Sequence, residues 1–206
     1  MIKIVDYGIG NIAAFLSLFK KLGIPAERAS TPEELRKASK IILPGVGSFD
    51  HAMQRLNQSG LRPFIEENTL SYKKPILGVC VGMQMLAEKS DEGSMAGLNL
   101  IPGRVRSFKE NAILNSHPIP HMGWNTINPV ADSKVFDAEL SKQEQFYFLH
   151  SYYFDATDKQ HVIATCEYGI KFDAVVAKDN IYGIQCHPEK SHEWGERFLK
   201  RFYEFA

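Results

Sequence analysis

The chain has 206 residues, with 24 Lys and Arg against 24 Asp and Glu, 44% hydrophobic residues and three cysteines. A chain of this length can bury a core without disulfide or metal staples, which excludes a stapled miniprotein and predicts a single domain over residues 1–206. Because the formal net charge is zero and both signs are scattered, we exclude a general nucleic-acid binder, which needs a basic face.

The sequence predicts a protein without membrane insertion. The longest uncharged stretch near residue 80, Pro75–Ala87, is 13 residues long, whereas a helix needs about 20 apolar residues to cross a bilayer. The first six residues lack the basic region, long apolar core and cleavage site of a secretory signal. We therefore expect a cytoplasmic location.

The first half of the chain alternates strand-like and helix-like segments. Each apolar run is followed by a segment of helical length. The apolar runs predict strands at 2–5, 40–43 and 76–79, and the longer segments predict helices at 12–22, 49–57 and 82–89. Between the first two units, Thr31 and Glu34 have capping-box spacing and Pro32 suits the first helical position, which predicts a helix over Pro32–Ala38. This alternation predicts βαβ units and a parallel sheet.

From Arg104 to Gln185 the pattern changes to short β-rich pieces. We predict strands at 145–154, 173–178 and 181–185, the last two forming a hairpin around Asp179 and Asn180. The closing segment, Ser191–Phe205, has apolar residues near helical spacing and predicts a helix packed on the sheet, through Trp194, Phe198, Leu199, Phe202 and Phe205. The predicted fold class is α/β, with a mostly parallel sheet flanked by helices and antiparallel hairpins in the second half.

Cys80 is the first candidate nucleophile. The segment Gly78-Val79-Cys80-Val81-Gly82 directly follows an apolar run and opens a helix-like segment, which is the strand, tight turn and helix of a nucleophile elbow. A helix N-terminus also stabilises a thiolate. The alternative is that Cys80 is a small buried side chain and the glycines only allow tight packing.

His187 and Glu189 are candidates for a base and the acid that orients it. In an extended segment, residues i and i+2 project to one face, and Pro188 would stiffen the chain between them. A cysteine nucleophile needs such a pair within hydrogen-bond reach. The alternative is a surface turn without chemistry.

The glycine-rich loop Pro44–Ser48 is a candidate for donors to an oxyanion. Two glycines there free the backbone to direct N–H groups at a ligand, and the amide of Val81, next to the nucleophile, could supply a second donor. A plain strand-to-helix loop is equally compatible with this pattern. The loop Asp6–Asn11 lacks the third glycine of a dinucleotide fingerprint, because Ala13 occupies that place, so we expect no Rossmann cofactor.

The two other cysteines receive no catalytic role. Cys186 should point away from the face of His187 and into the core, and Cys166 has neither a histidine nor a glycine turn beside it. His187 and His192 are too few for a metal site without further ligands, so we expect no metal.

Taken together, these motifs resemble the class I glutamine amidotransferases, which use a Cys-His-Glu triad on a flavodoxin-like sheet. The resemblance covers essentially the whole chain. Within that family, the order of the motifs is similar to that of the glutaminase subunits of imidazole glycerol phosphate synthases, through segments 6–11, 44–47, 78–84, 120–125, 150–152 and 187–191. The segment Pro-His-Met-Gly-Trp-Asn, residues 120–125, is the most specific of them.

The resemblance implies a chemistry, a set of site residues and a partner. Cys80 would attack the carboxamide of L-glutamine, His187 would move protons and Glu189 would orient His187, releasing ammonia and L-glutamate. The family's oxyanion loop maps onto Gly45, Val46 and Gly47, and its glutamine-binding residues onto Gln84, Ser151 and Tyr152. Ammonia would pass to a (β/α)8-barrel cyclase of histidine biosynthesis in a heterodimer, with His121, Trp124 and Lys190 at the interface.

Three alternatives stay open from the sequence. Related pairs of glutaminase and cyclase feed ammonia into cell-surface sugar amidination, so the branch is not fixed. A stand-alone cysteine hydrolase of γ-glutamyl compounds would not need segment 120–125, and a non-catalytic binding module would not need Cys80, His187, Glu189 and Gln84 together.

Overall fold

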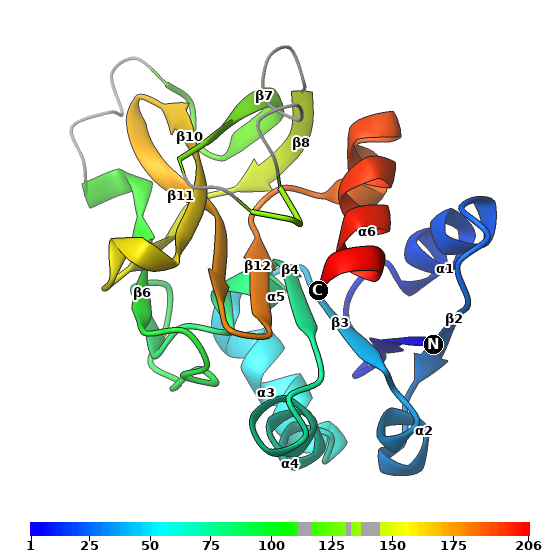
Figure 1. Cartoon of the computed structure of the whole chain (residues 1–206). Coiled ribbons are helices and arrows are strands. Elements are labelled where there is room, and N and C mark those ends of the chain that lie inside the picture. The colour runs from blue at the N-terminus through cyan, green and yellow to red at the C-terminus, as the bar shows by residue number, and fades with distance from the viewer. Residues whose placement is uncertain (111–116, 131–132, 137–144) are drawn as a thin grey trace.

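The computed structural model describes residues 1–110, 117–130, 133–136 and 145–206. Its centre is one sheet whose strands follow the order β2-β1-β3-β4-β12-β11-β10-β7-β8 (Figure 1). The first five strands are mutually parallel, namely β2 (Ala26–Ala29), β1 (Ile2–Val5), β3 (Lys40–Gly45), β4 (Ile76–Cys80) and β12 (Ile181–Ile184). The predicted parallel sheet in the first half is therefore confirmed.

The second half extends this sheet with antiparallel strands. Four strands continue it from β12 to its far edge, namely β11 (Ile170–Lys178), β10 (Val162–Tyr168), β7 (His121–Pro129) and β8 (Gln145–His150). A smaller group branches from β11: β9 (Tyr152–Ala156) pairs with β11, β6 (Gly103–Ser107) pairs with β9, and β5 (Lys89–Ser90) pairs with β6. The predicted hairpin is present, with Asp179 in its turn at φ 54°.

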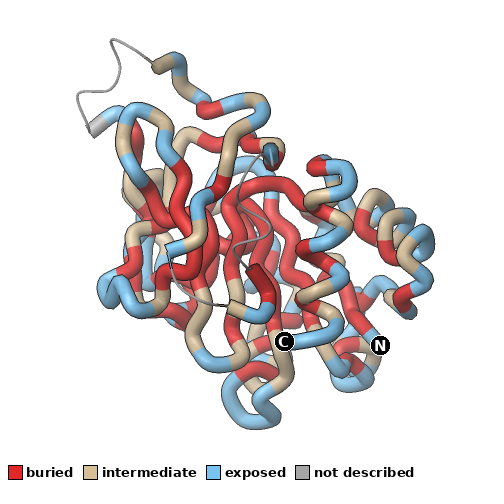
Figure 2. The backbone as a smooth tube through the Cα atoms, turned by 45° about the horizontal axis from the view of Figure 1, so that its top comes forward, coloured by how far each residue is buried: buried red, intermediate tan, exposed pale blue. Residues whose placement is uncertain are grey.

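Helices cover the parallel half on both sides (Figure 1). On one side lie α1 (Ile12–Lys21) and α6 (His192–Phe205), and on the other lie α2 (Pro32–Arg36), α3 (Phe49–Ser59) and α4 (Arg62–Glu66), which continues as a π-helix over Glu67–Ser71. Short turns complete the described elements: α5 (Val81–Gln84) and the 3₁₀ turns Phe108–Glu110, Lys159–His161 and Pro188–Lys190. Figure 2 shows the buried backbone concentrated in the sheet between these layers.

The helix at Pro32 begins as the sequence predicts. The hydroxyl of Thr31 accepts from the amide of Glu34 at 3.3 Å, and the Glu34 carboxylate accepts from the amide of Thr31 at 3.1 Å. This capping box satisfies two amides that a helix start leaves without partners. The helix ends at Arg36, two residues earlier than predicted.

The predicted helix 82–89 is wrong in its length, because α5 ends at Gln84. The carbonyls that would continue the helix are taken from outside it: Leu98 donates to Met85 at 2.8 Å and Leu100 donates to Leu86 at 2.9 Å. The segment around Leu98 and Leu100 thus takes the carbonyl acceptors that a longer helix would use. Local periodicity cannot predict this, because the segment lies outside the helical pattern.

Three other expectations need correction. The predicted strand 145–154 is two strands, β8 and β9, which pair with different neighbours and separate at Ser151. Trp124, which the sequence suggested on a loop, lies within β7. Phe205 is half exposed at the end of α6, whereas Phe198, Leu199 and Phe202 are buried as expected. Within the described residues, no helix is long and apolar enough to span a membrane.

The start of α5 packs directly on β3. A Cβ atom on Gly82 would lie 1.9 Å from the carbonyl oxygen of Leu43, and one on Gly78 would lie 2.5 Å from the carbonyl oxygen of Gly82. Neither glycine has a positive φ, so both are required for clearance between backbones and not for an unusual dihedral angle.

We predict that Gly82→Ala lowers the free energy of unfolding by about 3 kcal/mol, because backbone must move to admit the methyl group. The control is Gly60→Ala, at the left-handed end of α3, where no atom lies within 4 Å and only dihedral strain of about 1 kcal/mol is expected. Urea denaturation of both variants measures the difference, and equal losses would contradict the packing argument.

Candidate active site

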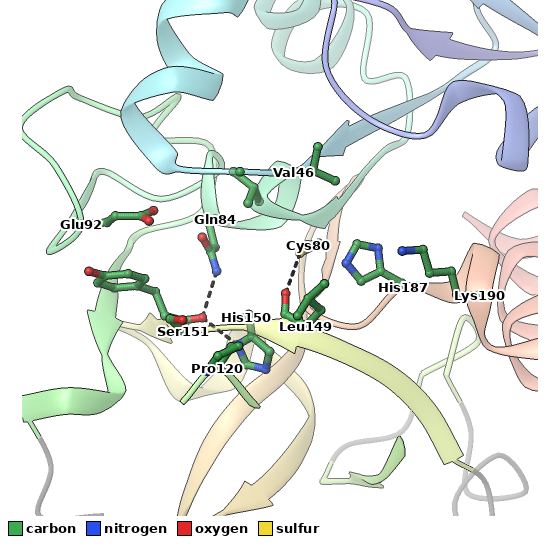
Figure 3. A pocket seen from close by; sticks show the side chains of 13 residues that line it. Val46, Cys80, Gln84, Glu92, Pro120, Leu149, His150, Ser151, His187 and Lys190 are labelled. Atoms are coloured by element: carbon green, nitrogen blue, oxygen red, sulfur yellow. Dashed lines mark hydrogen bonds between the residues drawn. The ribbon is translucent and has the colours of Figure 1, made fainter. Parts of the chain in front are cut away.

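A cavity of about 310 Å³ opens at the carboxyl end of the parallel strands, where small-molecule sites of open α/β sheets are usually found (Figure 3). The loop after β3, the β4–α5 turn and the segment after β12 form one side, and the junction of β8 with β9 forms the other. Its lining residues are Val46, Gly47, Cys80, Val81, Gln84, Glu92, Pro120, Leu149, His150, Ser151, Tyr152, His187 and Lys190.

Cys80 ends β4 in a strained conformation. Its φ of 55° and ψ of −115° fall outside the regions that residues with a Cβ normally adopt, at a cost on the order of 1–3 kcal/mol. The residue is 3% exposed, yet it lines the cavity, and its Sγ lies 3.9 Å from the carbonyl oxygen of Leu149 (Figure 3). The turn therefore presents the thiol to the cavity.

His187 is held next to Cys80 by strand β8. The amide of His187 donates to the carbonyl of Tyr147 at 2.8 Å, and the Ser191 hydroxyl donates to the carbonyl of His187 at 2.6 Å while accepting from the amide of Tyr147 at 3.0 Å. These bonds fix the position of the ring. His187 Nδ1 lies 2.9 Å from Glu189 Oε1, so the other ring nitrogen is the one left for the thiol.

The contact between His187 and Glu189 has a different local origin from the one we predicted. His187 itself is extended, but Pro188–Lys190 form a single 3₁₀ turn that returns Glu189 toward the ring. The predicted pairing of His187 with Glu189 is present, but a 3₁₀ turn produces it and not the alternation of side chains along a strand. The Glu189 side chain is only 2% exposed, so its carboxylate faces His187 and the protein interior.

The surroundings of His187 favour its charged form. Burial would by itself lower its pKa, but hydrogen bonds to Cys80 and Glu189, together with the negative charge of both groups, raise the pKa of His187 to about 10. An imidazolium next to a thiol stabilises the thiolate. The pair can therefore supply a nucleophile and a proton donor at neutral pH.

Gln84 and Glu92 present acceptors at the opposite end of the cavity (Figure 3). Gln84 Nε2 donates to the carbonyl of Tyr152 at 2.9 Å and to Gln185 Oε1 at 3.1 Å, which leaves its carboxamide oxygen to accept from a ligand. The Glu92 carboxylate accepts from the amide of Phe49 at 2.8 Å, and burial is the main cause that raises its pKa. This end of the cavity suits a cation or an ammonium group.

The loop after β3 lines the cavity on the side of the thiol. Gly45 pairs in register with Cys80 across β3 and β4, and Val46 and Gly47 follow it at the cavity wall. Gly47 has a φ of 83°, and Val46 is 42% exposed. Val81 begins α5 directly after Cys80, where backbone N–H groups have no partner within the helix.

Cys166 and Cys186 are both buried away from the cavity lining. Burial raises the pKa of Cys166 to about 12 and raises that of Cys186 well above its usual value. Neither is activated, which agrees with the core positions predicted for them. Among the described residues, no three His, Cys, Asp or Glu side chains are grouped closely enough to hold a metal ion.

Comparison with known proteins places this arrangement in a family. The family model of class-I glutamine amidotransferases matches residues 3–205. The chain belongs to this family. It is 52% identical to the imidazole glycerol phosphate synthase subunit HisH of Bdellovibrio bacteriovorus, over 99% of this chain and 100% of that protein. It is 44% identical to the subunit of the same name from Leptospira interrogans, over 98% of each chain.

Solved structures agree on the amidotransferase fold. A crystal structure of a glutamine amidotransferase superposes with a TM-score of 0.76 at 17% identity, covering 98% of this chain and 97% of that one. The structure of PurLQS from Thermotoga maritima gives a TM-score of 0.75 at 16% identity, over 99% and 97% of the two chains. At such identities the likeness concerns the fold, and it confirms the predicted fold class.

The amidotransferase cavity gathers most of the residues that the sequence singled out. Nine of them line it, namely Val46, Gly47, Cys80, Val81, Gln84, Ser151, Tyr152, His187 and Lys190, and Glu189 lies behind His187. Gly45 is not among the lining residues, but it pairs with Cys80 across β3 and β4. His121 and Trp124 are not among the lining residues: Trp124 is 44% exposed, whereas His121 is 2% exposed and cannot present its side chain at a surface.

Glu92 was not predicted from the sequence, and His150 was assigned no role. Glu92 lies in a polar segment without periodicity, and only the return of the chain after α5 brings it to the cavity. His150 was part of a recognised motif, but nothing local indicated that its ring would lie beneath the cavity (Figure 3). A histidine directly before Ser151 and Tyr152 was the signal that could have been used.

We predict that His187 resists deprotonation until about pH 10 and that Glu189→Gln lowers its pKa toward the usual value. Since its pKa is raised on folding, its contribution to stability is fully present below about pH 6.5, the unfolded value, and is lost as the pH rises toward 10. NMR titration of the His187 imidazole, in the unmodified chain and in Glu189→Gln, measures both pKa values. A wild-type midpoint near 6.5 would contradict this prediction.

Proposed function

We propose that this chain is the glutaminase subunit of an imidazole glycerol phosphate synthase, and that it hydrolyses L-glutamine to L-glutamate and ammonia for histidine biosynthesis. The observation that carries the proposal is the strained Cys80 beside the His187–Glu189 pair, in a cavity that fits a small molecule. The relatives that share 52% and 44% of its residues over nearly their full length bear the name of that subunit.

The first half of the reaction forms a thioester. The Cys80 thiolate attacks the side-chain carbonyl carbon of glutamine, and the negative charge moves to the carbonyl oxygen. We assign the backbone donors for that oxygen to the amide of Val81 and the loop of Val46 and Gly47, which line the cavity together with Cys80. His187 then protonates the amide nitrogen, the carbon–nitrogen bond breaks, and ammonia leaves.

The second half releases glutamate. His187, now neutral, accepts a proton from water as the water oxygen attacks the thioester carbon. The carbon–sulfur bond breaks, the Cys80 thiolate is restored, and His187 is again the imidazolium that Glu189 stabilises. No cofactor or metal takes part in either half.

The substrate is oriented by the polar end of the cavity. The α-ammonium group of glutamine matches the Glu92 carboxylate and the carboxamide oxygen of Gln84, since both accept hydrogen bonds. Ser151 and Tyr152 form the neighbouring wall, and their backbone belongs to the junction of β8 and β9. With its ammonium group held at this end, glutamine reaches Cys80 with its side-chain carboxamide.

The cavity opens into a face that suits a protein partner. Exposed apolar side chains cluster at its mouth: Val46 and Leu149 line it, and Met122 pairs in register with Leu149 and is 65% exposed. Trp124 continues this face with its ring stacked on His192 at 5.1 Å. Exposed aromatic and apolar residues around a cavity are typical of interfaces, and we assign this face, with Lys190, to a (β/α)8-barrel cyclase in a heterodimer.

We predict that Cys80→Ser reduces glutamate release by at least about a thousandfold, because a hydroxyl in this position is a far weaker nucleophile than a thiolate. The matched control is Cys166→Ser, which changes a buried thiol in β10 and should leave turnover near that of the unmodified chain. Glutamate is measured with the cyclase partner present. Retained activity in Cys80→Ser would exclude the thioester mechanism.

We predict that Trp124→Ala weakens binding to the cyclase by about tenfold or more, as expected for an exposed aromatic anchor. Calorimetry of the two chains measures the affinity, and Tyr72→Ala, which changes a 61% exposed aromatic side chain just after the π-helix and away from this face, serves as the control. Unchanged binding would remove Trp124 from the interface. Full glutaminase activity without any partner would point to a stand-alone hydrolase, and coupling only to a partner of sugar amidination would change the pathway.

A further inference from the structure

A chain of hydrogen bonds runs beneath the cavity from strand β7 to Gln84. Asn125 Nδ2 lies 3.2 Å from His121 Nε2, His121 Nδ1 lies 2.9 Å from His150 Nε2, and His150 Nδ1 lies 2.7 Å from the carbonyl oxygen of Tyr152. That carbonyl also accepts from Gln84 Nε2 at 2.9 Å. The chain thus ends at the residue to which we assign the ammonium group of glutamine.

Each proton in this chain has a defined place. A carbonyl only accepts, so His150 must carry its proton on Nδ1 and accept on Nε2, and His121 must then donate from its own Nδ1. The amide of Asn125 is oriented independently, because its Nδ2 donates to the carbonyl of Glu167 at 2.9 Å and its Oδ1 accepts from Thr126 at 2.8 Å. Every bond therefore runs in one direction, from Asn125 to Tyr152.

The two histidines are also fixed by packing. His121 is 2% and His150 is 6% exposed, and the ring of His121 lies between Phe148 at 4.7 Å and Tyr168 at 4.0 Å between centroids. Burial lowers the pKa of His121 to about 4, with a smaller effect from the charge of His117. Burial likewise lowers the pKa of His150 to about 3, with a smaller effect from the charge of His121, so the surroundings favour the neutral form of both rings that the directed chain requires.

We propose that Asn125, His121 and His150 are positioning residues for glutamine binding. They orient the Tyr152 carbonyl, and this carbonyl holds the carboxamide of Gln84 with its oxygen available to the substrate. The inference rests on the proposed function and adds three residues to its binding site, none of which needs to touch the reacting atoms. It also gives His121 a role, since a side chain that is 2% exposed is too buried to act at an interface.

The first test is spectroscopic and requires no turnover. In the full chain labelled with ¹⁵N, the imidazole shifts of His121 and His150 report which nitrogen carries the proton. We expect both rings to be neutral and protonated on Nδ1. A neutral ring protonated on Nε2, or an imidazolium at neutral pH, would contradict the directed chain of hydrogen bonds and overturn the proposal.

The second test separates binding from chemistry. His150→Phe keeps a ring but removes the donor, and we expect the KM for glutamine to rise about tenfold, equivalent to about 1.4 kcal/mol, with kcat little changed. His150→Asn restores a donor near the position of Nδ1 and should recover much of the loss. The control is Phe148→Leu, which disturbs the same packing without removing a hydrogen bond and should leave the KM within about twofold.

The outcomes distinguish the two proposals when the assays are run with the cyclase partner. An active unmodified chain with an unchanged KM in His150→Phe, or with an equal rise in Phe148→Leu, overturns the positioning role alone. An unmodified chain that releases no glutamate overturns the proposed function, and the positioning role with it, whatever protons the two histidines carry.

Discussion

The turn at Cys80 holds a residue with a side chain at φ 55°, and the site is organised around this strained turn. The strain persists because β3 and α5 approach each other so closely that Gly82 has no room for a Cβ atom. Residues of β3 are thereby brought alongside the thiol, and Gly45 pairs with Cys80 in register. One close backbone contact thus places the nucleophile, the first amide of α5 and the glycine-rich loop around the same point.

The two halves of the sheet contribute different parts of the chemistry. The parallel half supplies the thiol, the loop after β3 and Gln84, which all lie at the carboxyl ends of β3 and β4. The antiparallel half supplies the wall at Ser151 and Tyr152, and β8 also clamps His187 through Tyr147. Catalysis in this chain therefore depends on the junction between the halves, because Cys80 and His187 follow parallel strands whereas β8 of the antiparallel half holds His187 in place.

How much could be predicted from the sequence differs between elements. The strands predicted at 2–5 and 40–43, the capped helix at Pro32 and the hairpin at Asp179 depend on local patterns and turn residues. Each was found where expected, although the second strand continues to Gly45 and the helix ends at Arg36. The helix after Cys80 was predicted too long, since the residues around Leu98 take its carbonyl acceptors from a distance in sequence. The break at Ser151 was missed for a related reason: β8 and β9 pair with different strands.

By itself the sequence indicated Cys80, His187 and Glu189 of the candidate site, because a cysteine between glycines and a His-Pro-Glu segment are local features of side-chain chemistry and chain flexibility. It also determined the fold class, through the alternation of apolar periods. Only the tertiary structure decided that Cys80 bears the strain, that Glu92 reaches the cavity and that His121 is buried beneath it. These three features depend on contacts between segments far apart in the chain, and local sequence patterns do not predict such contacts.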